Sequence, residues 1–164
     1  MSVLKIVQHP SPVLRHRAAP IPRVTKSIVK LVRDMADTLY AANGVGLAAP
    51  QVDRSVRVIV VDAGNGLLAF VNPEIVDEEG NATDAEGCLS IPGVSGYVTR
   101  SARVVVRGLD AKGRAQRVEA DGLLARALQH EIDHLDGILF IDRANGMDDD
   151  GIEKLDGRID RKGG

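Results

Sequence analysis

The segment His130-Glu131-Ile132-Asp133-His134 constrains the fold of this chain more than any other feature, because it predicts a helix that carries a metal site. Residues four apart on an α-helix point to the same side, so the two imidazoles face one direction. A glutamate directly after the first histidine is typical of a metal site with its own proton carrier. Catalytic sites of this kind usually take three protein ligands. The third ligand therefore has to come from elsewhere in the chain.

Apolar periodicity and turn signals predict the elements of the first half of the chain. Residues 27–39 have helical spacing and are followed by Asn43-Gly44, which is typical of a helix end. Residues 56–61 and 67–71 are short runs rich in branched side chains. Because Gly64-Asn65-Gly66 between them is a good turn signal, we expect these two runs to pair as strands.

The second half predicts a hairpin and then the metal helix. Residues 103–108 and 117–120 flank a loop and are expected to be its two strands. The metal helix should begin near Asp121, and Gly137 follows it as a C-cap. Strands thus cluster in the middle without βαβ alternation, which predicts the α+β class. We expect antiparallel or mixed β-sheets packed around a central helix that carries the metal-binding histidines.

Length and composition predict one globular domain. The chain has 164 residues, 44% of them hydrophobic, which is enough for a single buried core. We place this domain at residues 1–144. Residues 145–164 are rich in charges, and we interpret them as a polar C-terminal tail that is a frayed helix or disordered.

Charge and hydropathy exclude several classes of protein. The net charge is −2 and there are four aromatic residues, so direct nucleic-acid binding is not expected. No apolar run approaches the roughly 18 residues that span a bilayer, and the start lacks the apolar core of a signal peptide. The single cysteine, Cys88, allows no intrachain disulfide. We therefore expect a soluble cytoplasmic protein without a membrane partner, and we favour a monomer.

The residues alone leave the third metal ligand open. In the metalloprotease pattern H-E-x-x-H-x-x-G-x-x-H, the last position is Phe140 here, which excludes that subclass. A thermolysin-like site takes its third ligand from a glutamate that follows the motif. Glu153 is the only glutamate there. Cys88 lies in a polar, glycine-containing stretch where a sharp loop could bring a thiolate against the helix, but an isolated cysteine is also commonly a small core residue.

Three blocks of the sequence resemble the motifs of the bacterial peptide deformylase family. These are Gly44-Val45-Gly46-Leu47-Ala48-Ala49-Pro50-Gln51, Glu86-Gly87-Cys88-Leu89-Ser90 and residues 129–137, which contain both histidines. They occur in the family's order and at about its spacing. The resemblance runs from residue 9 to residue 143 and so covers nearly the whole chain except the tail.

The resemblance implies a complete set of site residues. Cys88, His130 and His134 would hold Fe²⁺, for which Zn²⁺, Ni²⁺ or Co²⁺ can substitute, with water in the fourth position. Glu131 would be the general base and then the acid. Gln51 and the backbone N–H of Leu89 would stabilise the oxyanion that forms from the formyl oxygen.

The resemblance also implies the reaction and the substrate. The family removes the N-terminal formyl group from the formyl-methionine of newly synthesised proteins, so the partners would be N-formyl-methionyl peptides and nascent chains. Gly46 would lie against the substrate backbone, and Val45, Leu124 and Ala127 would line a pocket for the methionine side chain. Arg126 stands on the same helix face as His130. We expect its stem to line the pocket wall while its charged end reaches solvent.

Two other functions are weighed against deformylation. One is a thermolysin-like metalloendopeptidase with Glu153 as the third ligand. The other is a non-catalytic binding module that a metal ion stabilises. Both share the histidine pair. The first differs from a deformylase in its third ligand, and the second would bind the metal without turnover.

Overall fold

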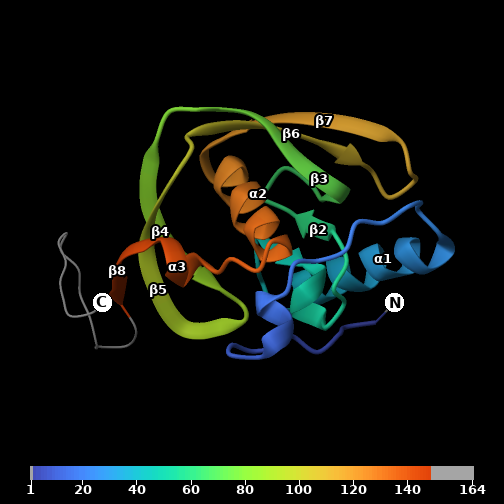
Figure 1. Cartoon of the computed structure of the whole chain (residues 1–164), viewed down its shortest axis with the longest axis horizontal. Coiled ribbons are helices and arrows are strands. Elements are labelled where there is room, and N and C mark those ends of the chain that lie inside the picture. The colour runs from blue at the N-terminus through green and yellow to red at the C-terminus, as the bar shows by residue number, and fades with distance from the viewer. Residues whose placement is uncertain (1, 149–164) are drawn as a thin grey trace.

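The computed structural model describes residues 2–148 as a mixed structure of two antiparallel sheets and two long helices (Figure 1). The helices are η1 (Pro12–Arg15), α1 (Lys26–Ala41), η2 (Ala49–Val52), α2 (Gly122–Leu135) and α3 (Phe140–Arg143). The strands are β1 (Gly46–Ala48), β2 (Val58–Val61), β3 (Leu68–Glu79), β4 (Ala82–Cys88), β5 (Ile91–Arg100), β6 (Arg103–Leu109), β7 (Ala115–Asp121) and β8 (Ala144–Asp148). The predicted α+β class is confirmed.

The larger sheet has five strands in the order β1-β2-β3-β6-β7, and every neighbouring pair is antiparallel. Val58 pairs with Val71 in the β2–β3 hairpin, and Val106 pairs with Val118 in the β6–β7 hairpin. Both predicted strand pairs are therefore confirmed. Strand β3 continues well past the predicted end at residue 71, with register shifts along its pairing to β6.

Strand β2 explains how the two long helices are placed, because its alternate side chains point to opposite faces. Val58 and Val60 pack in a cluster with α1, whereas Ile59 and Val61 pack in a cluster with α2. All four residues are fully buried. A strand that is covered on both faces is expected to be apolar throughout, as this one is.

Specific residues begin and end helix α1, which leads into strand β1. Thr25 caps the start of the helix by accepting a hydrogen bond from the N–H of Ile28. At the other end, Asn43 takes the left-handed conformation with φ 56°, and Gly44 donates its N–H to the carbonyl of Leu39. A helix end at Asn43-Gly44 was expected. Gly44 itself is needed for space, since a Cβ there would lie 2.9 Å from the Leu89 side chain.

The smaller sheet, in the order β4-β5-β8, was not predicted from the sequence. Its strands lack clear apolar alternation: β4 is largely exposed, and β5 contains Pro92, Gly93 and Gly96. Cys88 pairs with Ile91, so the expected sharp loop is a tight turn. Helix α2 contacts both sheets, through packing on β1, β2 and β7 and through Arg126, which reaches carbonyls of β4 and β5.

Strand β8 shows that the predicted C-terminal tail was placed too early in the chain. Residues 145–148 were expected to be frayed or disordered, but they belong to a strand that pairs with β5 from Ser95 to Val98. Backbone pairing makes this strand, and the sequence has no apolar alternation here that would have predicted it. Residues 149–164 of the expected tail lie outside the described residues.

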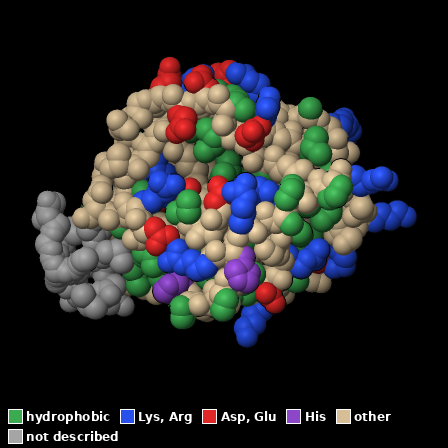
Figure 2. All heavy atoms as spheres, viewed as in Figure 1, with side chains coloured by type: hydrophobic (Ala, Val, Ile, Leu, Met, Phe, Trp, Pro, Cys, Tyr) green, Lys and Arg blue, Asp and Glu red, His purple; other side chains and the backbone are tan. Residues whose placement is uncertain are grey.

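The surface carries charges of both signs. Figure 2 shows Lys and Arg side chains interspersed with Asp and Glu side chains on one face of the molecule. In the part of the chain that the structure describes, no helix is both long enough and apolar enough to cross a membrane.

Candidate metal centre

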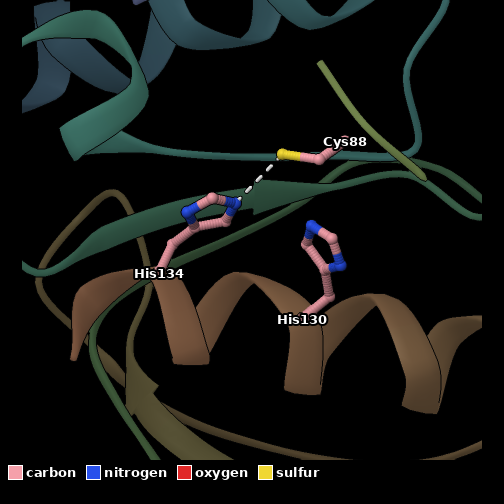
Figure 3. Close-up of side chains that lie close together, drawn as sticks. All are labelled: Cys88, His130 and His134. Atoms are coloured by element: carbon pink, nitrogen blue, oxygen red, sulfur yellow. Dashed lines mark hydrogen bonds between the residues drawn. The ribbon is translucent and has the colours of Figure 1, made fainter. Parts of the chain in front are cut away.

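Three side chains from two distant segments meet at one point between α2 and the β4–β5 turn. His130 and His134 project from successive turns of α2, and Cys88 ends β4 (Figure 3). Their ligand atoms all lie within 4.8 Å of one another, and the Cys88 Sγ is 3.3 Å from Nε2 of His134. The structure thus brings Cys88 to the histidine pair, as expected.

The residues present fit a divalent metal ion. One sulfur and two imidazole nitrogens are a donor set that suits borderline ions such as zinc and ferrous iron. Both imidazoles are buried, and among the described residues Nδ1 of His134 and Oε1 of Glu131 have no hydrogen-bond partner. A buried carboxylate oxygen is costly unless something pairs with it. The site is therefore arranged for a group beyond the protein itself.

Glu86 orients the first histidine from the side away from Cys88. Its carboxylate accepts a 2.8 Å hydrogen bond from Nδ1 of His130 and two bonds, of 2.6 and 2.9 Å, from Arg100. Burial opposes the charge of this carboxylate, but the bonds from His130 and Arg100 outweigh it and lower the pKa of Glu86 to about 2. Glu86 therefore stays ionised, and Nε2 of His130 is the ring nitrogen left for a ligand role.

Burial and neighbouring charges shift the pKa values of three groups at the centre. Burial by itself would lower the pKa of His130, but the Glu131 carboxylate and the bonds to Cys88 and Glu86 raise it to about 10. Burial raises the pKa of Glu131 to about 7 against the opposing effect of His130. The pKa of His134 is lowered by burial and by the His130 charge. Perturbed, mutually interacting ionisable groups of this kind are common at functional sites.

Gln51 lies beside the same centre on η2. Its Oε1 accepts a 2.9 Å hydrogen bond from the N–H of Ala48, so its Nε2 points the other way. This nitrogen donates to Oγ of Ser90 at 3.1 Å and lies 3.5 Å from the Cys88 Sγ. Leu89 lies between Cys88 and Ser90 in the chain and lines the cavity beside the centre. Both expected oxyanion donors are thus on segments that border the centre.

Gly46 makes room for Glu131. A Cβ at this position would lie 2.5 Å from Oε2 and 2.8 Å from Cγ of Glu131. Gly46 was expected to touch substrate, and it does line the cavity beside the centre. Its closest relationship in the structure is nevertheless with the carboxylate that is expected to carry the proton.

A cavity of about 410 Å³ opens onto the centre. Val45, Gly46 and Ala127 line it, as expected for the substrate pocket. The prediction that Leu124 lines the pocket is wrong. Leu124 is not among the lining residues and packs against the core cluster around α2. Leu123 lines the cavity instead. Helical spacing alone does not separate the two leucines, because Leu123 and Leu124 are four and three positions before Ala127.

Arg126 also lines the cavity, but its predicted orientation is wrong. The residue is 9% exposed, and its guanidinium donates to Oε2 of Glu86 at 2.7 Å and to the carbonyls of Val98 and Ala82 at 2.9 Å each. The charged end is therefore buried and paired instead of reaching solvent. Its partners lie on β4 and β5, which were not predicted.

A chain of ion pairs continues from Glu86 to the far end of α2. Arg100 donates to Asp133 at 2.9 Å, and Asp133 also accepts from Arg143 at 2.6 Å. Asp133 thus pairs with two arginines. Glu153, the third ligand of the thermolysin-like alternative, lies outside the described residues.

Comparison with known proteins identifies the family. The polypeptide deformylase family matches residues 3–150. The peptide deformylase of Pelotomaculum thermopropionicum is 55% identical over 147 residues, which are 90% of this chain and 95% of that protein. The one from Carboxydothermus hydrogenoformans is 53% identical over 147 residues, covering 90% and 97%.

Solved structures agree with this assignment. The crystal structure of peptide deformylase from Thermotoga maritima is similar with a TM-score of 0.86 at 40% identity, covering 88% of this chain and 99% of that one. Peptide deformylase from Ehrlichia chaffeensis in complex with actinonin gives a TM-score of 0.87 at 40% identity, covering 88% and 90%. The chain therefore belongs to the polypeptide deformylase family.

Proposed function

We propose that this chain hydrolyses the formyl amide at the N-terminal methionine of newly made peptides, with a divalent ion held by Cys88, His130 and His134. The observation that carries the proposal is the convergence of these three ligands beside a buried carboxylate, Glu131, and an oriented amide, Gln51. A protein that only needed a structural metal would have no use for the last two groups.

Glu131 moves the proton in this reaction. A bound divalent ion supplies a Lewis acid that polarises the formyl oxygen and makes the attacking water more acidic. Glu131 takes the proton of that water and returns it to the departing amine. Its Oε2 is 4.0 Å from Nε2 of His130, and its Oε1, which has no hydrogen-bond partner among the described residues, can accept from a water.

Gln51 and Leu89 stabilise the developing oxyanion. The Gln51 amide and the Leu89 backbone N–H are neutral donors, and the Gln51 side chain is held by hydrogen bonds to Ala48 and Ser90. Each such donor typically lowers the activation barrier by about 3 kcal/mol.

The apolar part of the cavity receives the methionine side chain. Val45 and Ala127 line its wall, and Gly46 leaves the space that a peptide backbone and Glu131 share. Leu123, which is 54% exposed, lies at the rim. Substrates are accordingly N-formyl-methionyl peptides and nascent chains.

The working ion in the cell is Fe²⁺, and Zn²⁺, Ni²⁺ or Co²⁺ can replace it. Thiolate ligation makes a ferrous centre sensitive to oxygen, so iron-loaded protein should lose activity in air while nickel-loaded protein keeps it. We further propose that the protein acts as a cytoplasmic monomer, which size-exclusion chromatography with light scattering would test.

The activity is tested with formyl-Met-Ala-Ser and acetyl-Met-Ala-Ser as matched substrates. We expect metal-loaded protein to release formate from the first and to leave the second intact, and we expect Glu131→Ala to abolish turnover while the metal stays bound. Cleavage inside the peptide without formate would indicate an endopeptidase. Tight metal binding without any turnover would indicate a binding module.

A further inference from the structure

We propose that Ser90 is a positioning residue whose hydroxyl holds the side-chain amide of Gln51, one of the two expected oxyanion donors, in its working orientation. This inference rests on the proposed function, since it concerns how the donors of that reaction are arranged. Ser90 follows Leu89 directly, is fully buried, and lies in the turn that also brings Cys88 to the metal centre.

The hydroxyl of Ser90 fixes the side chain of Gln51. The backbone N–H of Ala48 can only donate, so it identifies the Gln51 atom that faces it as the oxygen. The amide nitrogen has two hydrogens: one is donated to the Ser90 Oγ at 3.1 Å, and the nitrogen also faces the Cys88 Sγ at 3.5 Å. Ser90 thus holds the amide so that its second N–H points to the Cys88 Sγ, one of the expected metal ligands.

The backbone of the same turn is held by the N-terminal segment. His9 donates its N–H to the carbonyl of Ser90 at 2.8 Å, and the Gln8 side chain donates to the carbonyl of Leu89 at 3.3 Å. Val7 donates its N–H to the carbonyl of Gln51 at 2.7 Å. Residues 7–9 therefore tie η2 to the β4–β5 turn, and Ser90 is where the backbone and side-chain ties meet.

The chemistry of this position calls for a small hydroxyl. Fixed donors are effective because they need no reorganisation when charge develops. An alanine at position 90 would keep the size of the turn but leave the Gln51 amide with one partner fewer, and a displacement of about 1 Å in such a donor can cost about a hundredfold in rate.

The first test is Ser90→Ala with formyl-Met-Ala-Ser. We expect kcat to fall about ten- to a hundredfold, with KM and the bound metal per chain unchanged. Ser101→Ala is the matched control, because it removes a 2.6 Å hydroxyl bond to Glu78 away from the cavity and should leave kcat as it is. An unchanged kcat in Ser90→Ala would overturn the proposal, as would a loss that appears only in KM.

A double-mutant cycle with Gln51→Ala separates positioning from general weakening. If Ser90 acts through Gln51, Ser90→Ala should cost markedly less in the Gln51→Ala background than in the wild type. Equal costs in both backgrounds would overturn the proposal.

A measurement that needs no activity completes the test. In zinc-loaded wild-type protein, NMR should show a nuclear Overhauser contact between a Gln51 side-chain amide hydrogen and the Ser90 Hβ atoms, and its absence would overturn the inference even if Ser90→Ala failed to fold. A wild type that released no formate but showed this contact would contradict the proposed function and leave the placement of Gln51 by Ser90 intact.

Discussion

Glu86 and His130 are joined by a 2.8 Å hydrogen bond in which the buried carboxylate accepts from Nδ1 of the imidazole. The pKa of Glu86 is held at about 2, so the carboxylate only accepts and the histidine must donate at Nδ1. This bond fixes the tautomer that presents Nε2 to a metal ion.

Replacing Glu86 by glutamine should weaken metal binding about ten- to a hundredfold, as is usual when the partner of a ligating histidine is changed. Competition with a chelator would measure it. Glu74→Gln is the control, since Glu74 pairs with Arg107 on the surface by a 2.9 Å bond. Equal metal affinities in the two variants would show that Glu86 does not support the ligand.

Arg126→Met should destabilise the fold, because it leaves Glu86 with one buried partner fewer and removes the donor of two carbonyls. Breaking a buried pair from one side costs about 3–5 kcal/mol. Urea unfolding would measure the free energy. Arg103→Met, which breaks partly exposed pairs, should cost less than about 1 kcal/mol. A cost no larger at position 126 would contradict the buried placement of its charge.

Gly46→Ala should destabilise the protein by about 1–3 kcal/mol, because its Cβ would lie within 2.9 Å of three side-chain atoms of Glu131. The same substitution in a Glu131→Ala background removes those atoms, so most of this cost should disappear. Thermal unfolding of the four proteins in the cycle measures the coupling. Additive effects would mean that Gly46 and Glu131 do not compete for space.

Asp142 should contribute to acid sensitivity. A hydrogen bond from Arg15 lowers the pKa of this carboxyl below its ordinary value. The unfolded chain therefore takes up the proton first, so the stabilisation is complete above the ordinary pKa of about 4 and is lost as the pH falls through the folded value. The pair is partly exposed, and we expect about 1 kcal/mol or less.

Urea unfolding of wild type and Asp142→Asn between about pH 7 and pH 3 checks this sign. The difference in unfolding free energy should be largest near neutral pH and should shrink towards pH 3. A difference that grew on acidification would contradict the account.

The histidine pair and its glutamate could be predicted because helical spacing is a local property of the chain. Whether Cys88 joins them could not be decided from the residues alone, since this depends on how the β4–β5 hairpin docks on α2. Glu86 and Arg100 of the hairpin make that contact with side chains of α2 that lie 33 to 44 residues away in the sequence. The family resemblance supplied Cys88, whereas no motif revealed the buried end of Arg126.

The same distinction applies to the fold. The β2–β3 and β6–β7 hairpins were predictable because branched residues and turn signals mark them. Strands β4, β5 and β8 were missed because exposed, polar or glycine-containing strands are held by backbone pairing and carry no alternation. The choice of Leu124 over Leu123 failed for a simpler reason, since a shift of one position on a helix turns a side chain by about 100°.

The central claim is that Cys88, His130 and His134 bind one catalytic ion together, and the electronic absorption spectrum of cobalt-loaded protein tests it most directly. We predict one Co²⁺ per chain with an intense near-ultraviolet sulfur-to-cobalt charge-transfer band that disappears in Cys88→Ser. Stoichiometric cobalt binding without that band, or a band that persists in Cys88→Ser, would contradict the claim.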